Sequence, residues 1–170
     1  MRLNCKLLAT IAIVCSASAA DAQVEPWRTE GLFAGAHAVA IHQPANGSAV
    51  GGLVGAGLTR HFSVLLAVDV GAVEVSDTMR MIAHADLALR AYPLAARRIA
   101  PFAEIAFSAQ GIETSSDDML SRSAFTWGVG AEWFYKTTRS VVVQLTRTEL
   151  PVAPTYRVGF GIHLRPRREE

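Results

Sequence analysis

The sequence predicts an all-β protein, an eight-stranded antiparallel up-and-down transmembrane β-barrel that follows a cleaved signal peptide. Three observations support this fold class. Ala124–Tyr135 alternates bulky apolar residues with small or polar ones, and a period of two indicates a strand. Similar segments of about 8–13 residues recur between turn signals, a spacing typical of sandwiches and barrels. The face opposite the bulky one is rich in Ala, Thr and Gly, which suits a crowded lumen with aromatic residues turned toward lipid.

The N-terminal leader, residues 1–22, is interpreted as a secretory signal peptide. A basic start, the apolar run Leu7–Val14 and two small-residue cleavage sites, Ala17–Ala19 and Ala20–Ala22, are typical of an exported chain. The apolar run is well short of the ~20 residues that a spanning helix needs. A lipoprotein site at Cys15 is disfavoured because a bulky residue precedes it.

Composition limits what the mature chain can do. Both cysteines, Cys5 and Cys15, lie in the leader, so the rest of the chain can form neither a disulfide nor a thiolate metal site. The leader also holds two of the 16 basic and one of the 15 acidic residues, and the nearly neutral remainder argues against nucleic-acid binding. We expect a periplasmic tail over 23–30, a barrel over 31–165 and a C-terminal tail over 166–170.

Eight strands are expected along the chain, and no window beyond the leader is apolar enough for a spanning helix. The expected strands are Gly31–His42, Ala49–Leu58, Phe62–Val73, Arg80–Tyr92, Ala100–Gln110, Ala124–Tyr135, Val141–Arg147 and Tyr156–Leu164. Turn signals separate them. Pro44–Ser48 contains Asn-Gly, the strongest short hairpin signal. Glu113–Arg122 is a polar loop and Pro151–Pro154 a rigid one.

The first four strands differ in how clearly they alternate. The first places Phe33 and His37 on one face, but its Ala- and Gly-rich sequence leaves the direction of that face open, and the second is mostly small residues. The third has one apolar face, with Asp69 on the other. The fourth collects His84 and Asp86 on one face, whereas a helix would scatter its charges around the cylinder.

The last four strands repeat the same division. In the fifth, Glu104 lies opposite an apolar face, and in the sixth Glu132 lies among glycines. The seventh sets Gln144 against Val and Leu. The eighth alternates Val, Phe, Ile and Leu with small or charged residues and is nearly as regular as the sixth.

Charged residues on the small-residue faces form a predicted lumen charge network. Its members are Asp69, His84, Asp86, Arg90, Glu104, Glu132, Arg157 and His163. Charges in a narrow lumen must pair, because an unpaired buried charge is costly. We therefore expect ion pairs that fill the barrel and fix its register.

Bulky rings are expected at the two membrane interfaces. With the amino terminus on the periplasmic side, strand ends alternate between the two membrane faces, which gives two aromatic belts. The predicted interface aromatics are Phe62, Tyr92, Phe102, Trp133 and Tyr135 at the periplasmic end and Phe125, Trp127 and Tyr156 at the outer end. Tyr92 and Phe102 are included because they lie near the periplasmic ends of their strands, although alternation directs their side chains into the lumen.

Within the last strand, the segment Arg157–Leu164 carries a polar residue, then glycine two positions on, then hydrophobic residues. With the eight-strand pattern over Gly31–Arg165, the chain resembles the small outer-membrane β-barrels related to the membrane domain of outer membrane protein A. That family's last strand ends in an aromatic, where this chain has Leu164 and continues beyond it. The resemblance implies a monomer in the bacterial outer membrane, with lipid and the barrel-assembly machinery as partners.

No catalytic, cofactor or metal site is expected. A lipid hydrolase would need a serine near a histidine and a carboxylate, and Ser108, with His84, His163 and Glu104, supplies parts without a recognisable motif. The five histidines lack metal-ligand spacing.

The sequence thus favours a structural or interaction barrel with a plugged lumen. Two alternatives stay open. One is a small gated pore whose ion pairs rearrange. The other is an exported lipocalin-like barrel that binds an apolar ligand and turns Trp127 and Trp133 inward.

Overall fold

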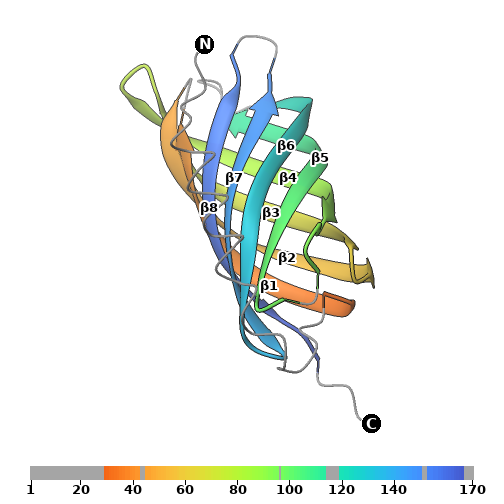
Figure 1. Cartoon of the computed structure of the whole chain (residues 1–170). Helices are drawn as coiled ribbons and strands as arrows, with labels where there is room; N and C mark the ends of the chain where they lie inside the picture. Colours follow the sequence, from red (N-terminus) through yellow and green to blue (C-terminus); the bar gives the residue numbers. More distant parts are fainter. Residues whose placement is uncertain (1–28, 43–44, 96, 114–118, 151–152, 167–170) are drawn as a thin grey trace, which may run out of the picture.

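The computed structural model describes residues 29–42, 45–95, 97–113, 119–150 and 153–166. The signal-peptide prediction lies outside this part of the chain. The described residues form one closed antiparallel barrel whose strands tilt around a common axis (Figure 1). No helix among them is long and apolar enough to cross a membrane.

The barrel is an up-and-down meander in which each strand pairs with its neighbours in sequence, and β8 closes the sheet against β1. The strands are β1 Gly31–His42, β2 Asn46–Thr59, β3 Phe62–Val75, β4 Thr78–Ala91, β5 Ile99–Glu113, β6 Met119–Lys136, β7 Arg139–Glu149 and β8 Thr155–Leu164. Closure gives every strand two hydrogen-bonded partners, which is how a sheet satisfies its backbone groups without water. The predicted fold class is confirmed.

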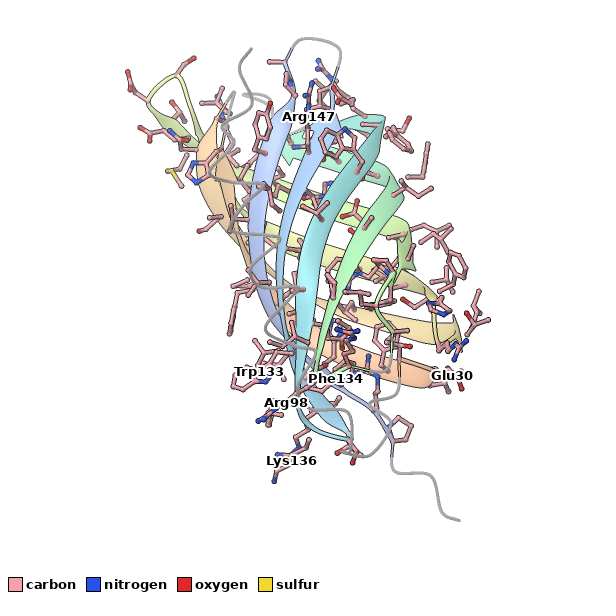
Figure 2. The ribbon with its side chains drawn as sticks, viewed as in Figure 1. Glu30, Arg98, Trp133, Phe134, Lys136 and Arg147 are labelled. Atoms are coloured by element: carbon pink, nitrogen blue, oxygen red, sulfur yellow. The ribbon has the colours of Figure 1, made fainter. Side chains whose placement is uncertain are left out.

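The two ends of the barrel differ in their connections. We call the end with the β2–β3, β4–β5 and β6–β7 connections the base, and the opposite end the mouth. Figure 2 shows Arg98, Trp133, Phe134 and Lys136 together at the base, and Arg147 toward the mouth. Ser76 and Asp77, in the β3–β4 turn at the mouth, have positive φ angles of 49° and 60°, which short polar residues adopt more easily than β-branched ones.

Several boundaries extend beyond those expected. Asn46 and Gly47 belong to β2, paired with Glu74 and Val73 of β3, so the predicted Asn-Gly turn is wrong. β6 begins at Met119 and continues strand pairing into what was expected to be loop. In both places the strand begins where it pairs with a longer neighbouring strand. This tertiary effect cannot be read from turn residues in the local sequence.

The outward face of the barrel is apolar along most of its height. Its exposed large side chains come from every strand and include Leu66, Val68, Val70, Leu87, Ile105, Phe107, Trp127, Val129, Trp133, Val143, Leu145, Val158, Phe160 and Ile162. Trp127 is 44% and Trp133 46% exposed. Both face outward, contrary to the lipocalin-like alternative.

The inward face is filled by apolar clusters as well as by charges. Val39, Ile41, Ala49, Val73 and Ile82 pack together toward the mouth. A second cluster contains Phe33, Leu53 and Leu65, and a third around Tyr92, Phe102 and Phe134 fills the base. An eight-stranded barrel is just wide enough for side chains to fill.

Candidate functional site in the lumen

The eight residues of the predicted charge network all lie inside the barrel. Each is at most 8% exposed: Asp69, His84, Asp86, Arg90, Glu104, Glu132, Arg157 and His163. They come from β3, β4, β5, β6 and β8, whose alternation turns one face inward. The structure divides them among three groups along the lumen.

The first group, the basal cluster, consists of Tyr92, Glu132, Ser140, His163 and Arg165. The Glu132 carboxylate is fully buried. Its Oε1 accepts hydrogen bonds from Ser140 Oγ at 2.5 Å and Arg165 Nη2 at 2.8 Å, and it lies 3.2 Å from His163 Nδ1. Its Oε2 accepts from Tyr92 Oη at 3.0 Å. A carboxylate with this many donors is fixed in place.

Tyr92 and Phe102 correct the predicted aromatic belt, because both rings lie inside the barrel at 1% and 4% exposure. Their height near the base was expected, but alternation decides the face they occupy. Burial and the neighbouring Glu132 carboxylate raise the pKa of Tyr92 to about 12, so the phenol stays protonated as a donor. Phe102 fits beside Gly130, where a Cβ would collide with its ring.

The second group joins the basal cluster to mid-barrel. Arg90 Nε donates to Glu104 Oε2 at 2.5 Å, and Arg90 Nη2 donates to Gln144 Oε1 at 2.7 Å. The guanidinium also lies 4.4 Å from the centre of the Phe102 ring, a cation–π contact. Arg90 and Glu104 face each other directly in the β4–β5 register.

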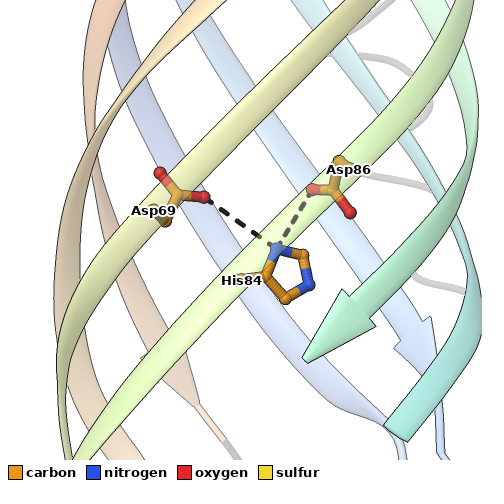
Figure 3. A group of neighbouring side chains, drawn as sticks. All are labelled: Asp69, His84 and Asp86. Atoms are coloured by element: carbon orange, nitrogen blue, oxygen red, sulfur yellow. Dashed lines mark ion pairs between the residues drawn. The ribbon is translucent and has the colours of Figure 1, made fainter. Parts of the chain in front are cut away.

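The third group, the middle cluster, consists of His37, Asp69, His84, Asp86 and Arg157. Arg157 Nη2 donates to Asp86 Oδ2 at 3.0 Å, and Arg157 Nη1 lies 2.7 Å from His84 Nδ1. His84 Nδ1 is 3.3 Å from Asp86 Oδ2 and 4.0 Å from Asp69 Oδ2 (Figure 3). His37 Nε2 contacts Asp69 Oδ1 from the other side.

The hydroxyl group considered as a nucleophile lies in a chain of hydrogen bonds. Ser108 is fully buried, and its Oγ donates to Asp86 Oδ1. Ser108 Oγ is also 2.6 Å from Thr126 Oγ1, which is 2.8 Å from Thr148 Oγ1. The row crosses β4 to β7 and supplies Asp86 with a neutral donor, a structural use of the serine.

The free space inside the barrel widens toward the mouth. A cavity of about 20 Å³ touches His37, Asp69, Asp86 and Arg157 on the basal side of the middle cluster. Another of about 10 Å³ touches Asp69, His84 and Arg157 on its mouth side. This second cavity shares Ile41, Ile82, Gln110 and Thr155 with a cavity of about 360 Å³ at the mouth.

The other predicted interface aromatics lie on the outside at the two ends. Phe62, Trp133 and Tyr135 are exposed near the base, and Phe125 and Trp127 toward the mouth, while Tyr156 is partly buried there. Arginines accompany both belts. Arg98 lies 5.9 Å from the Trp133 ring, and Arg147 lies 5.8 Å from Trp127 and 5.7 Å from Tyr156.

Among the histidines, carboxylates and arginines of the lumen groups, two were not in the predicted network: His37 and Arg165. His37 was left out because the facing of β1 was undecided, although it alternates with Phe33, Val39 and Ile41, which all turn inward. Arg165 follows the last strand residue and was counted as the barrel's final position, not as part of its charge network. The continuing alternation after His163 was the signal for its inward direction.

Comparisons with known proteins identify the fold. Neither the family models nor the curated proteins gave a match. Among solved structures, OprG of Pseudomonas aeruginosa aligns with a TM-score of 0.58 at 10% identity, over 84% of this chain and 100% of that one. The N-terminal barrel domain of OprF from the same organism gives 0.56 at 13% identity, over 78% and 96%. Neisserial surface protein A gives 0.54 at 10% identity, over 79% and 96%.

At such identities the likeness concerns the fold alone. It agrees with the resemblance drawn from the strand pattern and the last strand. The chain therefore has the fold of the small eight-stranded outer-membrane β-barrels.

Proposed function

We propose that this protein resides in the bacterial outer membrane as a structural or interaction barrel whose lumen is closed at its base. The apolar wall supports a lipid environment, because a soluble barrel would expose these same side chains to water. Outer-membrane lipid is then the principal partner. The Arg157–Leu164 segment of β8 supports insertion by the barrel-assembly machinery, and the closed sheet, which leaves no strand edge for a second copy, supports a monomer.

The observation that carries the closed lumen is the basal cluster. Glu132, Arg165 and the rings of Phe33 and Phe134 meet at one level, with the Arg165 guanidinium 5.3 Å and 4.8 Å from the two ring centres. A hydrated ion would have to separate Arg165 from Glu132 and Ser140 to pass. Breaking such a buried ion pair leaves uncompensated charge in a medium of low dielectric constant.

The residues considered for catalysis make contacts that agree with a structural role. The Ser108 hydroxyl donates to Asp86, the Arg157 guanidinium lies against His84, and Glu104 pairs with Arg90. Each candidate group thus has a structural partner within the lumen.

The second candidate is a small gated pore, favoured by the mouth cavity, which leads toward the middle cluster. Planar-bilayer recording on the refolded mature chain separates the two functions. A plugged barrel gives no discrete conductance steps at any applied voltage up to membrane rupture. Reproducible steps in the wild-type protein, absent from a refolding blank, would contradict the plug and establish the pore.

A further inference from the structure

We propose that three cations beside the aromatic belt at the base, Arg98, Lys136 and Arg139, form a binding site for the headgroup of an anionic phospholipid. The inference rests on the proposed function, because the site has this partner only if the barrel lies in a membrane. All three side chains are exposed. Figure 2 shows Arg98, Trp133 and Lys136 on one side of the base.

Two connections at the base bring these cations to the end of β6. Arg98 ends the β4–β5 connection, and its carbonyl oxygen accepts a backbone hydrogen bond from Phe134 of β6 at 2.8 Å. Lys136 and Arg139 flank the β6–β7 turn and face each other in the strand register. Pairing within the sheet thus gathers three positive charges that are far apart in the sequence.

The outward rings at the base give the height of the site in a bilayer. The Arg98 guanidinium lies 5.9 Å from the centre of the Trp133 ring, and the Tyr135 ring lies 6.4 Å from that of Trp133. Both rings are exposed on the outside of the barrel. Tryptophan and tyrosine in this position lie at the level of the lipid headgroups. The neighbouring cations therefore lie at the level of the lipid phosphates.

The charge of the site selects an anionic headgroup. Within the described part of the chain, none of the three cations forms an ion pair with a carboxylate. Glu132 is buried and paired with Arg165, and the exposed Glu30 lies on the other side of the base (Figure 2). A guanidinium presents a planar set of donors that fits a phosphate. The same cations repel the ammonium group of a zwitterionic lipid.

The mouth provides the contrasting case. There Arg147 lies 5.8 Å from the Trp127 ring, but its Nε is 2.9 Å from Glu149 Oε1. An arginine thus accompanies an outward tryptophan at both ends of the barrel. At the mouth a carboxylate of the protein already neutralises the arginine, whereas at the base the described residues leave the charge to the lipid.

The tryptophans allow each end to be probed separately, because the mature chain has only Trp27, Trp127 and Trp133. Trp27→Phe with Trp127→Phe leaves the base ring as the single fluorophore, and Trp27→Phe with Trp133→Phe leaves the mouth ring. Each variant is refolded into phosphatidylcholine vesicles that contain brominated phosphatidylglycerol or, in a matched set, brominated phosphatidylcholine. Bromine quenches a nearby tryptophan, so the ratio of quenching measures the local preference for the anionic lipid.

At low salt we expect phosphatidylglycerol to be enriched at Trp133 by roughly tenfold or more, since each basic residue near an anionic lipid surface contributes roughly a factor of five. Trp127 should report no enrichment. Substituting all three cations, Arg98→Gln, Lys136→Gln and Arg139→Gln, should abolish the preference at Trp133. Arg147→Gln is the matched control and should leave it unchanged. High salt should weaken it, because screening shortens the reach of exposed charges.

A refolded barrel in which Trp133 shows no preference for phosphatidylglycerol overturns the proposal, as does a preference that the triple variant retains. Retention on isolated peptidoglycan that requires the three cations, without a lipid preference, would assign them to an acidic cell-wall polymer instead. A chain that does not refold in phosphatidylcholine alone would contradict the proposed function and this inference with it. The refolded state, checked by the band that boiling shifts, therefore separates the two failures.

Discussion

The basal and middle clusters use the same residue types and differ in how fully they are packed. In the basal cluster one carboxylate, Glu132, is surrounded by Tyr92, Ser140, His163 and Arg165. In the middle cluster the single arginine, Arg157, pairs with Asp86, while Asp69 is contacted by His37, and cavities lie on both sides. A charged lumen can thus be a tightly packed plug at one level and a cluster bordered by free space at another.

The largest expected effect is at the plug. Glu132→Leu should lower the free energy of unfolding by ~3–5 kcal/mol, because it leaves Arg165 buried without its partner. Urea unfolding in detergent or lipid measures this loss. Glu149→Leu is the matched control: its ion pair with Arg147 is solvent-exposed, and a change below about 1 kcal/mol is expected. Equal losses of unfolding free energy for the two substitutions would mean that the buried pair stabilises the barrel no more than the exposed pair does.

A double-mutant cycle tests the link between the clusters. Arg90→Met alone should cost ~3–5 kcal/mol, since Glu104 would stay buried without its ion-pair partner. Adding Glu104→Leu should recover most of that loss, because an apolar pair of similar volume avoids desolvation of both charges. Additive losses in the same urea assay would show that the two residues do not act as a pair.

Asp86→Asn in the middle cluster should cost less, ~1–3 kcal/mol, as expected when a buried hydrogen-bonding group loses its partner. The adjoining cavities touch Arg157, so water can solvate the guanidinium once the carboxylate charge is gone. Urea unfolding of Asp86→Asn and Glu132→Leu under the same conditions compares their losses of unfolding free energy. A loss as large as that at Glu132 would mean that the middle cluster is as tightly packed as the plug.

Gly130→Ala should cost ~1–3 kcal/mol, the usual cost of overpacking a core, which is less than the cost at Glu132. The added Cβ would press on the Phe102 ring that helps fill the base and on the backbone oxygen of Val143, at 2.5 Å. Gly52→Ala is the control, because its Cβ would meet only the Gly35 carbonyl oxygen at 3.6 Å. Thermal unfolding of both variants measures the difference, and identical midpoints would argue against tight packing at Phe102.

Alternation along single strands predicted much of the lumen. The period of two identified the inward side of β3, β4, β5, β6 and β8, and with it residues as far apart as Asp69 and His163. The alternation along one strand does not indicate which side chains meet across the lumen. That Arg157 would meet Asp86, or that Glu132 would meet Arg165, depends on how the closed sheet sets its register.

The errors have the same origin. Tyr92 and Phe102 were assigned to the membrane interface from their position along the barrel axis. Inside the lumen, however, Tyr92 donates a hydrogen bond to Glu132 and the Phe102 ring packs against the Arg90 guanidinium. The facing of β1 was undecided because Ala and Gly carry too little hydrophobic contrast. His37 was missed as a consequence, and with it the contact between His37 and Asp69.

The most direct measurement is the migration of the refolded mature chain on a gel, cold and boiled, after incubation with lipid vesicles, with detergent or in plain buffer. An apolar wall around a charged lumen predicts a compact band that boiling shifts, formed only with lipid or detergent. A folded, monodisperse monomer in plain buffer would contradict the membrane barrel, because the outward Trp127 and Trp133 would then have to tolerate water.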